Sequence, residues 1–337
     1  MARPTLVSLA KELGVSRQTV SNVINAPHLV KPETRERVQA AIERTGYRPN
    51  YAAQALRNQR SQTLAMRIYP SSDGIYGAVM DRFHHQLVRE ARTRGYNIMP
   101  ITAEDDRDEV EQLISLHDRG SIDGCLISGT SRTDVRPAEF VKKGLPMVAF
   151  GRPWSNPDCQ HYWVDVDGAA GTMAGTTHFI RAGFERIGFV GMLPGSGPGD
   201  DRREGWRSAM RTAFPAMDLE GWDSASVDSV EAGVEAANRL FDRGAQALVC
   251  ASDSLAFGSW ETFRQRGGND HEVPVIGFDG SPVARAIGMS SVAQPVETAV
   301  QLLVEALLRQ VRDDSAGAGM TPALLDARLV LRGQSAC

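Results

Sequence analysis

The 337-residue sequence predicts a small all-helical N-terminal head, followed by a two-lobed α/β body of parallel sheets flanked by helices. Apolar residues at helical spacing, in segments that end at glycines, predict the head. Short apolar runs that alternate with amphipathic stretches predict the body. Charge separates the two parts. The first 60 residues hold ten Lys and Arg against four Glu, a net +6, whereas the whole chain carries −4. A basic end on an acidic chain indicates an electrostatic partner for that end.

Composition excludes several classes of protein. With 42% hydrophobic and 23% charged residues, the chain is typical of globular proteins rather than disordered or collagenous ones. The four cysteines stand far apart without a C-x-x-C pair, which fits a reducing compartment. No signal peptide is apparent, and no stretch approaches the roughly 18 apolar residues of a membrane span. We therefore expect a cytoplasmic protein that needs neither metal nor cofactor.

The head, residues 1–48, is predicted to form three short helices. Apolar residues at i, i+3, i+4 and i+7 mark the first, which ends at Gly14. Ser16 is placed to cap the second, and the third begins at Pro32 and stops at Gly46. Two short helices joined by a tight turn with a glycine form the helix-turn-helix unit.

The outward face of the second helix carries no carboxylate and presents Arg17, Gln18 and Asn22. In a DNA major groove, Arg can fork onto guanine, while Asn and Gln can fork onto adenine. The alternative is an ordinary solvated surface, but the basic charge and the helix spacing favour base reading. Double-stranded DNA is therefore the expected partner of the head.

These residues resemble the LacI/GalR (lactose-repressor and galactose-repressor) family of bacterial transcription regulators. The resemblance runs through TLVSLAKELGVSRQTVSNVIN, VKPETRERVQAAIERTGYRPN and AAQALRNQRS. It assigns base reading to Arg17, Gln18 and Asn22. It also assigns phosphate contacts to Thr5, Ser16, Thr19, Ser21, Asn25 and Thr34. Since most members carry Arg where this chain has Asn22, we expect an operator that differs from the common one.

Residues 49–61 are predicted to be a hinge helix and linker. The helical stretch from Tyr51 to Asn58 is too short to be stable alone in water. The resemblance implies a hinge that folds in the minor groove around Ala53 and Leu56, with Leu56 wedged between central base pairs. The alternative is a plain helical linker whose Leu56 packs on the body.

Residues 62–337 alternate predicted strands with predicted helices. The candidate strands are 63–69, 96–101, 122–128, 146–150, 186–192, 247–251 and 274–278. The candidate helices are 79–94, 109–119, 168–182, 201–214, 231–243 and 255–266. Such alternation predicts parallel sheets with helices on both faces, and two sets of strands predict two lobes. Ligands of such sheets bind beyond the carboxyl ends of the strands, here in the cleft between the lobes.

The resemblance extends over the body and implies the fold of periplasmic sugar-binding proteins. It places the first lobe at about 62–162 and 293–322, and the second at about 163–292 and 323–333. Only two residues follow RLVLRGQS, so we expect no tetramerising C-terminal helix and a homodimer that binds a pseudo-palindromic operator.

Polar and aromatic residues near the ends of predicted strands are the candidate effector contacts. They are Tyr76, Arg152, Trp154, Asp165, Arg202, Trp206, Asp253 and Asp279. Guanidinium and carboxylate groups hydrogen-bond vicinal hydroxyls, which favours a small carbohydrate. Structural explanations stay open: Asp253 could cap a helix, Arg202 could pair in solvent, and Trp side chains more often pack in cores. Ser252, Gly280 and the SSDGIYG loop depart from the family pattern.

Three functions compete. Glycines in GFVGMLPGSGPGD suggest a nucleotide loop, but no Gly-Lys-Ser/Thr follows and Pro198 removes a backbone donor, so we expect no enzyme. A free-standing sugar-binding protein would suit the body but not the head. We therefore predict a DNA-binding regulator, a repressor of carbohydrate-utilisation genes, controlled by a sugar or related metabolite. A non-sugar metabolite or a protein partner is the alternative effector, and an activator role stays open.

Overall fold

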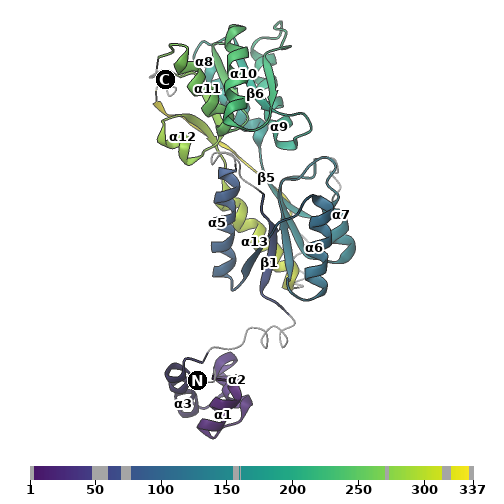
Figure 1. The fold of residues 1–337 in the computed structure, drawn as a ribbon, viewed down its shortest axis with the longest axis vertical. Helices are drawn as coiled ribbons and strands as arrows, with labels where there is room; N and C mark the ends of the chain where they lie inside the picture. The colour runs from purple at the N-terminus through teal and green to yellow at the C-terminus, as the bar shows by residue number, and fades with distance from the viewer. Residues whose placement is uncertain are drawn as a thin grey trace. The chain divides into compact units, whose positions relative to one another are not determined.

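The computed structural model describes residues 4–47, 60–69, 77–154, 159, 161–269, 273–312 and 320–333. The chain forms two compact units, residues 1–61 and 62–337, drawn as a ribbon in Figure 1. The predicted boundary between linker and body coincides with this division. Within the described part of the chain, no helix has both the length and the apolar character to span a membrane.

The head has the predicted three helices. Its elements are α1 (Leu6–Leu13), α2 (Arg17–Asn25), a short 3-10 turn η1 (Pro27–Leu29) and α3 (Pro32–Thr45). The side chain of Thr5 accepts from the Ser8 amide at 3.1 Å, and Ser16 accepts from the Thr19 amide at 3.0 Å. Gly14 ends α1 with φ of 65°, a left-handed conformation that favours glycine. Caps and stops read from the sequence therefore define these helices. Their shared core contains Leu9, Val20, Val38 and Ala41.

The first lobe is a six-stranded parallel sheet in the order β11-β5-β4-β3-β1-β2. Its strands are β1 (Thr63–Arg67), β2 (Asn97–Ile101), β3 (Gly124–Ile127), β4 (Met147–Phe150), β5 (Tyr162–Val166) and β11 (Ala323–Leu325). Its helices are α5 (Ala78–Thr93), α6 (Asp106–Asp118), α7 (Arg136–Lys143) and α13 (Val296–Arg312). Leu64 and Met66 pack under α5 and α13, whereas Ala65 between them faces α6 and α7. Helices therefore cover both faces of this sheet (Figure 1).

The second lobe is a six-stranded sheet in the order β12-β10-β9-β8-β6-β7, parallel except for β12 against β10. Its strands are β6 (Ile187–Met192), β7 (Asp223–Ser226), β8 (Ala247–Cys250), β9 (Val275–Asp279), β10 (Ser290–Ala293) and β12 (Arg328–Val330). Its helices are α8 (Gly168–Arg181), α9 (Gly197–Ala213), α10 (Val230–Asp242), α11 (Asp253–Gln265) and α12 (Pro282–Ala286). The predicted fold class is confirmed for both lobes.

The chain passes between the lobes slightly later than predicted. β5 pairs with β4 and β11 pairs with β5, so the first lobe extends to Val166 and includes residues up to Leu325. The sequence had assigned residues 163–166 and 323–325 to the second lobe. Strand pairing depends on partners far along the chain, which a local pattern does not contain. The same reason explains why the short strands β7, β10, β11 and β12 and the short helices α7 and α12 were not among the candidate elements.

Candidate functional site

The predicted reading face lies on α2. Arg17 and Gln18 are exposed and Asn22 is half-buried. The Nε2 of Gln18 donates to Oδ1 of Asn22 at 2.9 Å, so the two amides support each other on one helix face. With no acidic residue in its first turn, α2 presents a positively polarised N-terminus beside them. This surface combines side chains that can form two hydrogen bonds to one base with a positive helix terminus that attracts the DNA phosphates.

Four of the six predicted phosphate contacts, Thr5, Ser16, Thr19 and Thr34, lie at helix starts. Thr5 and Ser16 cap α1 and α2, and the Oγ atoms of Ser16 and Thr19 lie 2.9 Å apart. Ser21 and Thr34 are half-buried, on α2 and in the first turn of α3. Ala53, Leu56 and Tyr76 lie outside the described residues, as does the side chain of Asn25. The roles assigned to all of the predicted DNA-contact residues stay predictions.

Arg202 and Asp279 form an inner site in the second lobe. The sequence had placed Arg202 at the start of a helix, but it lies in the second turn of α9, which begins at Gly197 behind the cap Ser196. Nη1 of Arg202 donates to the Ala251 carbonyl at 2.5 Å and lies 3.7 Å from Oδ1 of Asp279. The guanidinium stacks 3.8 Å above the Phe278 ring.

One donor of this inner site is free. The side chain of Arg202 is 9% exposed, and its buried Nε has no hydrogen-bond partner among the described residues. A buried donor without an acceptor costs about 1–3 kcal/mol, so an oxygen-bearing ligand would find a group already desolvated. Arg202 is thus fixed by its other contacts, while its Nε lies buried without a partner.

Asp279 is held in an unusual state at the end of β9. Its φ of 115° is rare for a residue with a side chain, and its Oδ1 accepts from Nε2 of Gln294 at 2.6 Å. Burial raises the pKa of Asp279 to about 7, against the opposing effect of Arg202, and the charges of Asp253 and Asp228 raise it further. Gln294, which the sequence did not single out, lies on the crossover between β10 and α13. The inner site therefore includes a segment that joins the lobes.

The structure contradicts two predicted effector contacts. Trp206 is 0% exposed, stacks with Phe189 and donates its indole N–H to the Ile187 carbonyl at 3.1 Å. Asp253 is 1% exposed, and its two oxygens accept from the Ser281 amide and the Ser291 hydroxyl, each at 2.6 Å. Both residues lie in the interior of the second lobe, where their polar atoms are satisfied. The first turn of α11 contains Asp253, but the cap is Ser252.

Arg152 bridges the two lobes. Its Nε donates to Oδ2 of Asp165 on β5 at 2.6 Å, and its Nη2 donates to Oδ2 of Asp201 on α9 at 3.2 Å. Asp201 also accepts from the Ala169 amide at 3.1 Å. Burial raises the pKa of Asp201, while Arg152 opposes that rise. Asp165 therefore positions Arg152, and Arg152 contacts Asp201 of the second lobe.

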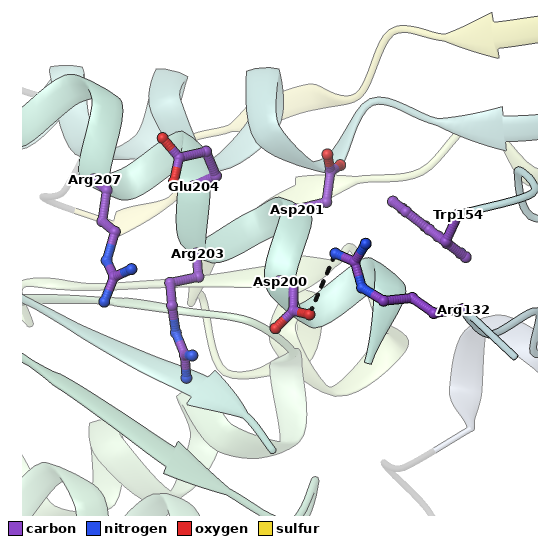
Figure 2. Close-up of a pocket in the computed structure, with 7 residues that line it drawn as sticks. All are labelled: Arg132, Trp154, Asp200, Asp201, Arg203, Glu204 and Arg207. Atoms are coloured by element: carbon purple, nitrogen blue, oxygen red, sulfur yellow. Dashed lines mark ion pairs between the residues drawn. The ribbon is translucent and has the colours of Figure 1, made fainter. Parts of the chain in front are cut away.

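An outer chamber of about 460 Å³ opens between the lobes along α9 (Figure 2). Its walls are Arg132, Trp154, Asp200, Asp201, Arg203, Glu204 and Arg207. Nη2 of Arg132, from the first lobe, lies 3.6 Å from Oδ2 of Asp200 on α9. Of the predicted effector contacts that the structure describes, Trp154 alone lines this chamber. Figure 2 shows Arg203 and Arg207 side by side on α9, with Trp154 beyond Asp201.

Trp154 is fixed where the lobes meet. Its Nε1 donates to Oγ1 of Thr130 at 3.2 Å, and the Arg152 guanidinium lies 4.6 Å from its ring centroid. A Cβ on Gly197, the first residue of α9, would fall 2.3 Å from the indole ring. Arg152 and Gly197 thus cover part of the Trp154 ring.

A buried ion cluster supports the first-lobe wall of the chamber. Arg136 is 0% exposed and bonds Glu109 at 2.8 Å, Asp134 at 2.7 Å and the Ser128 carbonyl at 3.0 Å. These contacts pin the loop between β3 and α7, which carries Thr130 and Arg132. The sequence indicates part of this cluster, because the side chain of Arg136, two residues after Asp134, can fold back onto the Asp134 carboxylate. The long-range partner Glu109 is not evident from the sequence.

Two family models match the chain. Residues 5–50 match bacterial regulatory proteins of the lacI family, and residues 67–313 match periplasmic binding proteins and the sugar binding domain of the LacI family. The transcriptional regulator CelR of Thermobifida fusca is 32% identical over 306 residues, covering 88% of each chain.

Solved structures agree with these matches. The structure described as a CelR–cellobiose complex is 29% identical, with a TM-score of 0.69 over 98% of this chain and 99% of that one. A lac repressor dimer bound to operator and the anti-inducer ONPF shares the fold, with a TM-score of 0.82 over 99% of both chains at 20% identity. The helix-turn-helix head, the two-lobed body and these matches agree. The chain belongs to the LacI family of bacterial DNA-binding transcriptional regulators.

Proposed function

We propose that this protein is an operator-binding repressor of carbohydrate-utilisation genes whose DNA affinity is set by a small saccharide in the inter-lobe cleft. The observation that carries the proposal is the inner site: a buried, desolvated guanidinium with a free Nε beside the Asp279 carboxyl. We place the protein in the cytoplasm, where its DNA partner is, and assign it no catalytic role or cofactor.

On the DNA side, Arg17, Gln18 and Asn22 would read base edges from α2, and the capping hydroxyls would meet phosphates. A homodimer would place two heads on a pseudo-palindromic operator, because a two-fold protein reads a two-fold site. Leu56 would supply the minor-groove wedge at the centre of that site.

On the effector side, vicinal hydroxyls suit the inner site. A hydroxyl oxygen can accept from Nε of Arg202 while its hydrogen is donated to Asp279. Gln294 then connects the bound ligand to the β10–α13 crossover. A ligand shifts the equilibrium between two arrangements of the lobes only if it binds one of them more tightly. A ligand at the inner site would meet that condition, because Gln294 links the site to a segment that joins the lobes. The cellobiose in the CelR structure supports the saccharide class, since CelR is 32% identical to this chain.

The test uses the full-length protein and an operator selected from random DNA. We expect one saccharide of a mono- and disaccharide panel to change operator affinity about 5- to 150-fold, the usual range for coupled sites. Asp279→Ala should abolish this response without changing affinity in the absence of ligand. The exposed carboxylate of Glu235 on α10 provides the control Glu235→Ala, which should respond like the parent.

Two outcomes would redirect the proposal. If no saccharide alters operator binding, a non-sugar metabolite or a protein partner becomes the effector to seek. If Asp279→Ala responds like the parent, the effector does not use the inner site.

A further inference from the structure

A second cavity, of about 640 Å³, lies on the second lobe between α9 and β7. The walls of this α9–β7 pocket are the second half of α9, the connection 215–221 and Asp223, the first residue of β7. Helix α9 contacts the first lobe at Asp201, and Arg211 of the pocket lies about 15 Å further along the helix. Arg207 is shared with the outer chamber, but all of the lining residues belong to the second lobe. The pocket therefore has the size of a small-molecule site, roughly 300–1,000 Å³, outside the cleft between the lobes.

The connection that forms one wall is held in place by hydrogen bonds. Nη2 of Arg243, at the end of α10, donates to the Glu220 carbonyl at 2.9 Å, and the same guanidinium lies 5.5 Å from the ring centroid of the buried Trp222. The Glu220 amide donates to Oδ1 of Asp218 at 3.0 Å. Gly221 has a φ of 76°, a conformation that favours glycine. The backbone that carries Asp218 and Glu220 is thus fixed.

The two guanidinium groups of the pocket differ in how they are compensated. Arg207 pairs with Asp223 at 3.0 Å, and the Asp223 side chain is 19% exposed. Arg211 has Glu204 at 4.0 Å, and these two side chains are 65% and 61% exposed. An exposed pair at such a distance contributes little to stability. Arg211 is therefore the cation that a ligand carboxylate could approach without breaking a strong pair.

The connection supplies carboxylates and apolar surface. Glu220 is exposed, and its carboxylate has no hydrogen bond or ion pair to any residue that the structure describes. Asp218 is also exposed, with one oxygen occupied by the Glu220 amide. Met217 and Leu219 alternate with these two residues and are half-buried against the core of the second lobe. Apart from the neutral Arg207–Asp223 pair, the pocket presents one guanidinium, two carboxylates and an apolar surface.

We propose that the α9–β7 pocket binds a basic amino acid of the class of arginine and lysine. Such a ligand carries two cationic groups and one carboxylate, the inverse of the charges that the pocket presents. Its carboxylate would accept from Arg211, its cationic groups would donate to Asp218 and Glu220, and its aliphatic chain would lie on Met217 and Leu219. A phosphate would meet two carboxylates against one cation. The site is separate from the effector site of the proposed function and would give the regulator a second ligand.

The experiment is calorimetric titration of the full-length protein in the absence of saccharide and DNA. The ligands are L-arginine and L-lysine, their decarboxylated counterparts agmatine and cadaverine, and L-leucine and L-glutamate, which lack the cationic side chain. We expect arginine or lysine to bind at least about tenfold more tightly than its decarboxylated counterpart, leucine or glutamate, a difference of about 1.4 kcal/mol.

Two variants separate the roles of the two walls. Arg211→Ala should lower the affinity for the amino acid to that of its decarboxylated counterpart and leave the affinity for the counterpart unchanged, because only the amino acid has a carboxylate. Glu220→Gln should weaken both ligands, because both present a cationic group. The matched controls are Arg181→Ala on α8 and Glu235→Gln on α10, exposed positions outside the pocket that should bind like the parent. Equal urea midpoints for the four variants and the parent would show that folding is unaffected.

The remaining outcomes contradict the inference. If neither arginine nor lysine binds, or if each binds no more tightly than its decarboxylated counterpart, the pocket is not an amino-acid site. Unchanged affinity in both Arg211→Ala and Glu220→Gln would place the ligand elsewhere on the protein. Tighter binding of glutamate would make the pocket an anion site. Because no saccharide is present in these titrations, each of these results would leave the proposed function standing.

Discussion

Asp279 is the residue at which the inner site becomes sensitive to pH. Its pKa rises from an ordinary 3.8 to about 7, so the folded state holds the proton more tightly than the unfolded chain. Stability from the protonated carboxyl is therefore fully present below about pH 4 and is lost as pH rises towards 7. Asp279→Asn mimics the protonated form, so it should raise the free energy of unfolding at pH 8 and change it little at pH 4.

Urea unfolding of the parent and Asp279→Asn at the two pH values measures this effect. An equal change at both, or a loss of stability at pH 8, would show that the ionised carboxylate is well accommodated beside Arg202.

Asn22 is the residue that should most distinguish the operator of this protein from the common operator of the family. Its amide is oriented by the hydrogen bond from Gln18 and can fork onto one base. Asn22→Ala should cost about 1–3 kcal/mol at one base pair of each half-site and relax preference there. Binding to an operator library measures it, with the exposed Gln39→Ala on α3 as the control. An unchanged base preference would show that α2 does not read the operator bases through Asn22.

At the scale of elements, the packing of α8 on α9 positions the inner site. A Cβ on Gly205 would fall 2.0 Å from the Ala169 carbonyl and 2.4 Å from Oγ1 of Thr172, so only glycine allows this approach. Gly205→Ala must push the helices apart and should cost about 1–3 kcal/mol of unfolding free energy, the usual penalty of overpacking.

The control for Gly205→Ala is Ser208→Ala, an exposed position on the same helix that should be neutral or slightly stabilising. Urea unfolding compares the two variants. If Gly205→Ala were as stable as the parent, α8 and α9 would have room to separate, and the position of Arg202 would not depend on their contact.

At the scale of the whole body, two ion pairs join the lobes among the residues that the structure describes. Arg152–Asp201 is 3.2 Å long with both side chains largely buried, whereas Arg132–Asp200 is 3.6 Å long with Arg132 half exposed. Exposed pairs contribute about 0–1 kcal/mol, so the buried pair should dominate lobe closure. Asp201→Asn should open the lobes, and Asp200→Asn should have little effect.

Small-angle scattering measures that opening as a larger radius of gyration for Asp201→Asn, and titration with the effector measures an accompanying loss of affinity. Equal radii for the two variants would mean that the crossover segments rather than the charges set the angle between the lobes.

Local features determined a large part of this protein from sequence alone. Thr5, Ser16, Gly14 and Gly46 define the helices of the head because caps and left-handed stops act within a few residues. The two sets of alternating strands and helices determined the class of the body. Arg152 and Asp279 were predicted as effector contacts because polar residues at the carboxyl ends of parallel strands converge on one edge, and that role stays a prediction.

Tertiary structure decided what those residues contact. Helical spacing puts Arg202 and Trp206 on one face of α9, but only long-range packing gives Trp206 the partners Phe189 and Ile187 and sets Arg202 on Phe278 beside Asp279. The sequence predicts Asp253 to contact the effector, but the distant residues Ser281 and Ser291 donate hydrogen bonds to both of its carboxylate oxygens. Arg132 pairs across the lobes with Asp200, and Gln294 donates to Asp279 from the β10–α13 crossover. Periodicity indicates which face of an element is buried, whereas the partner on that face is chosen by long-range packing, which no local pattern encodes.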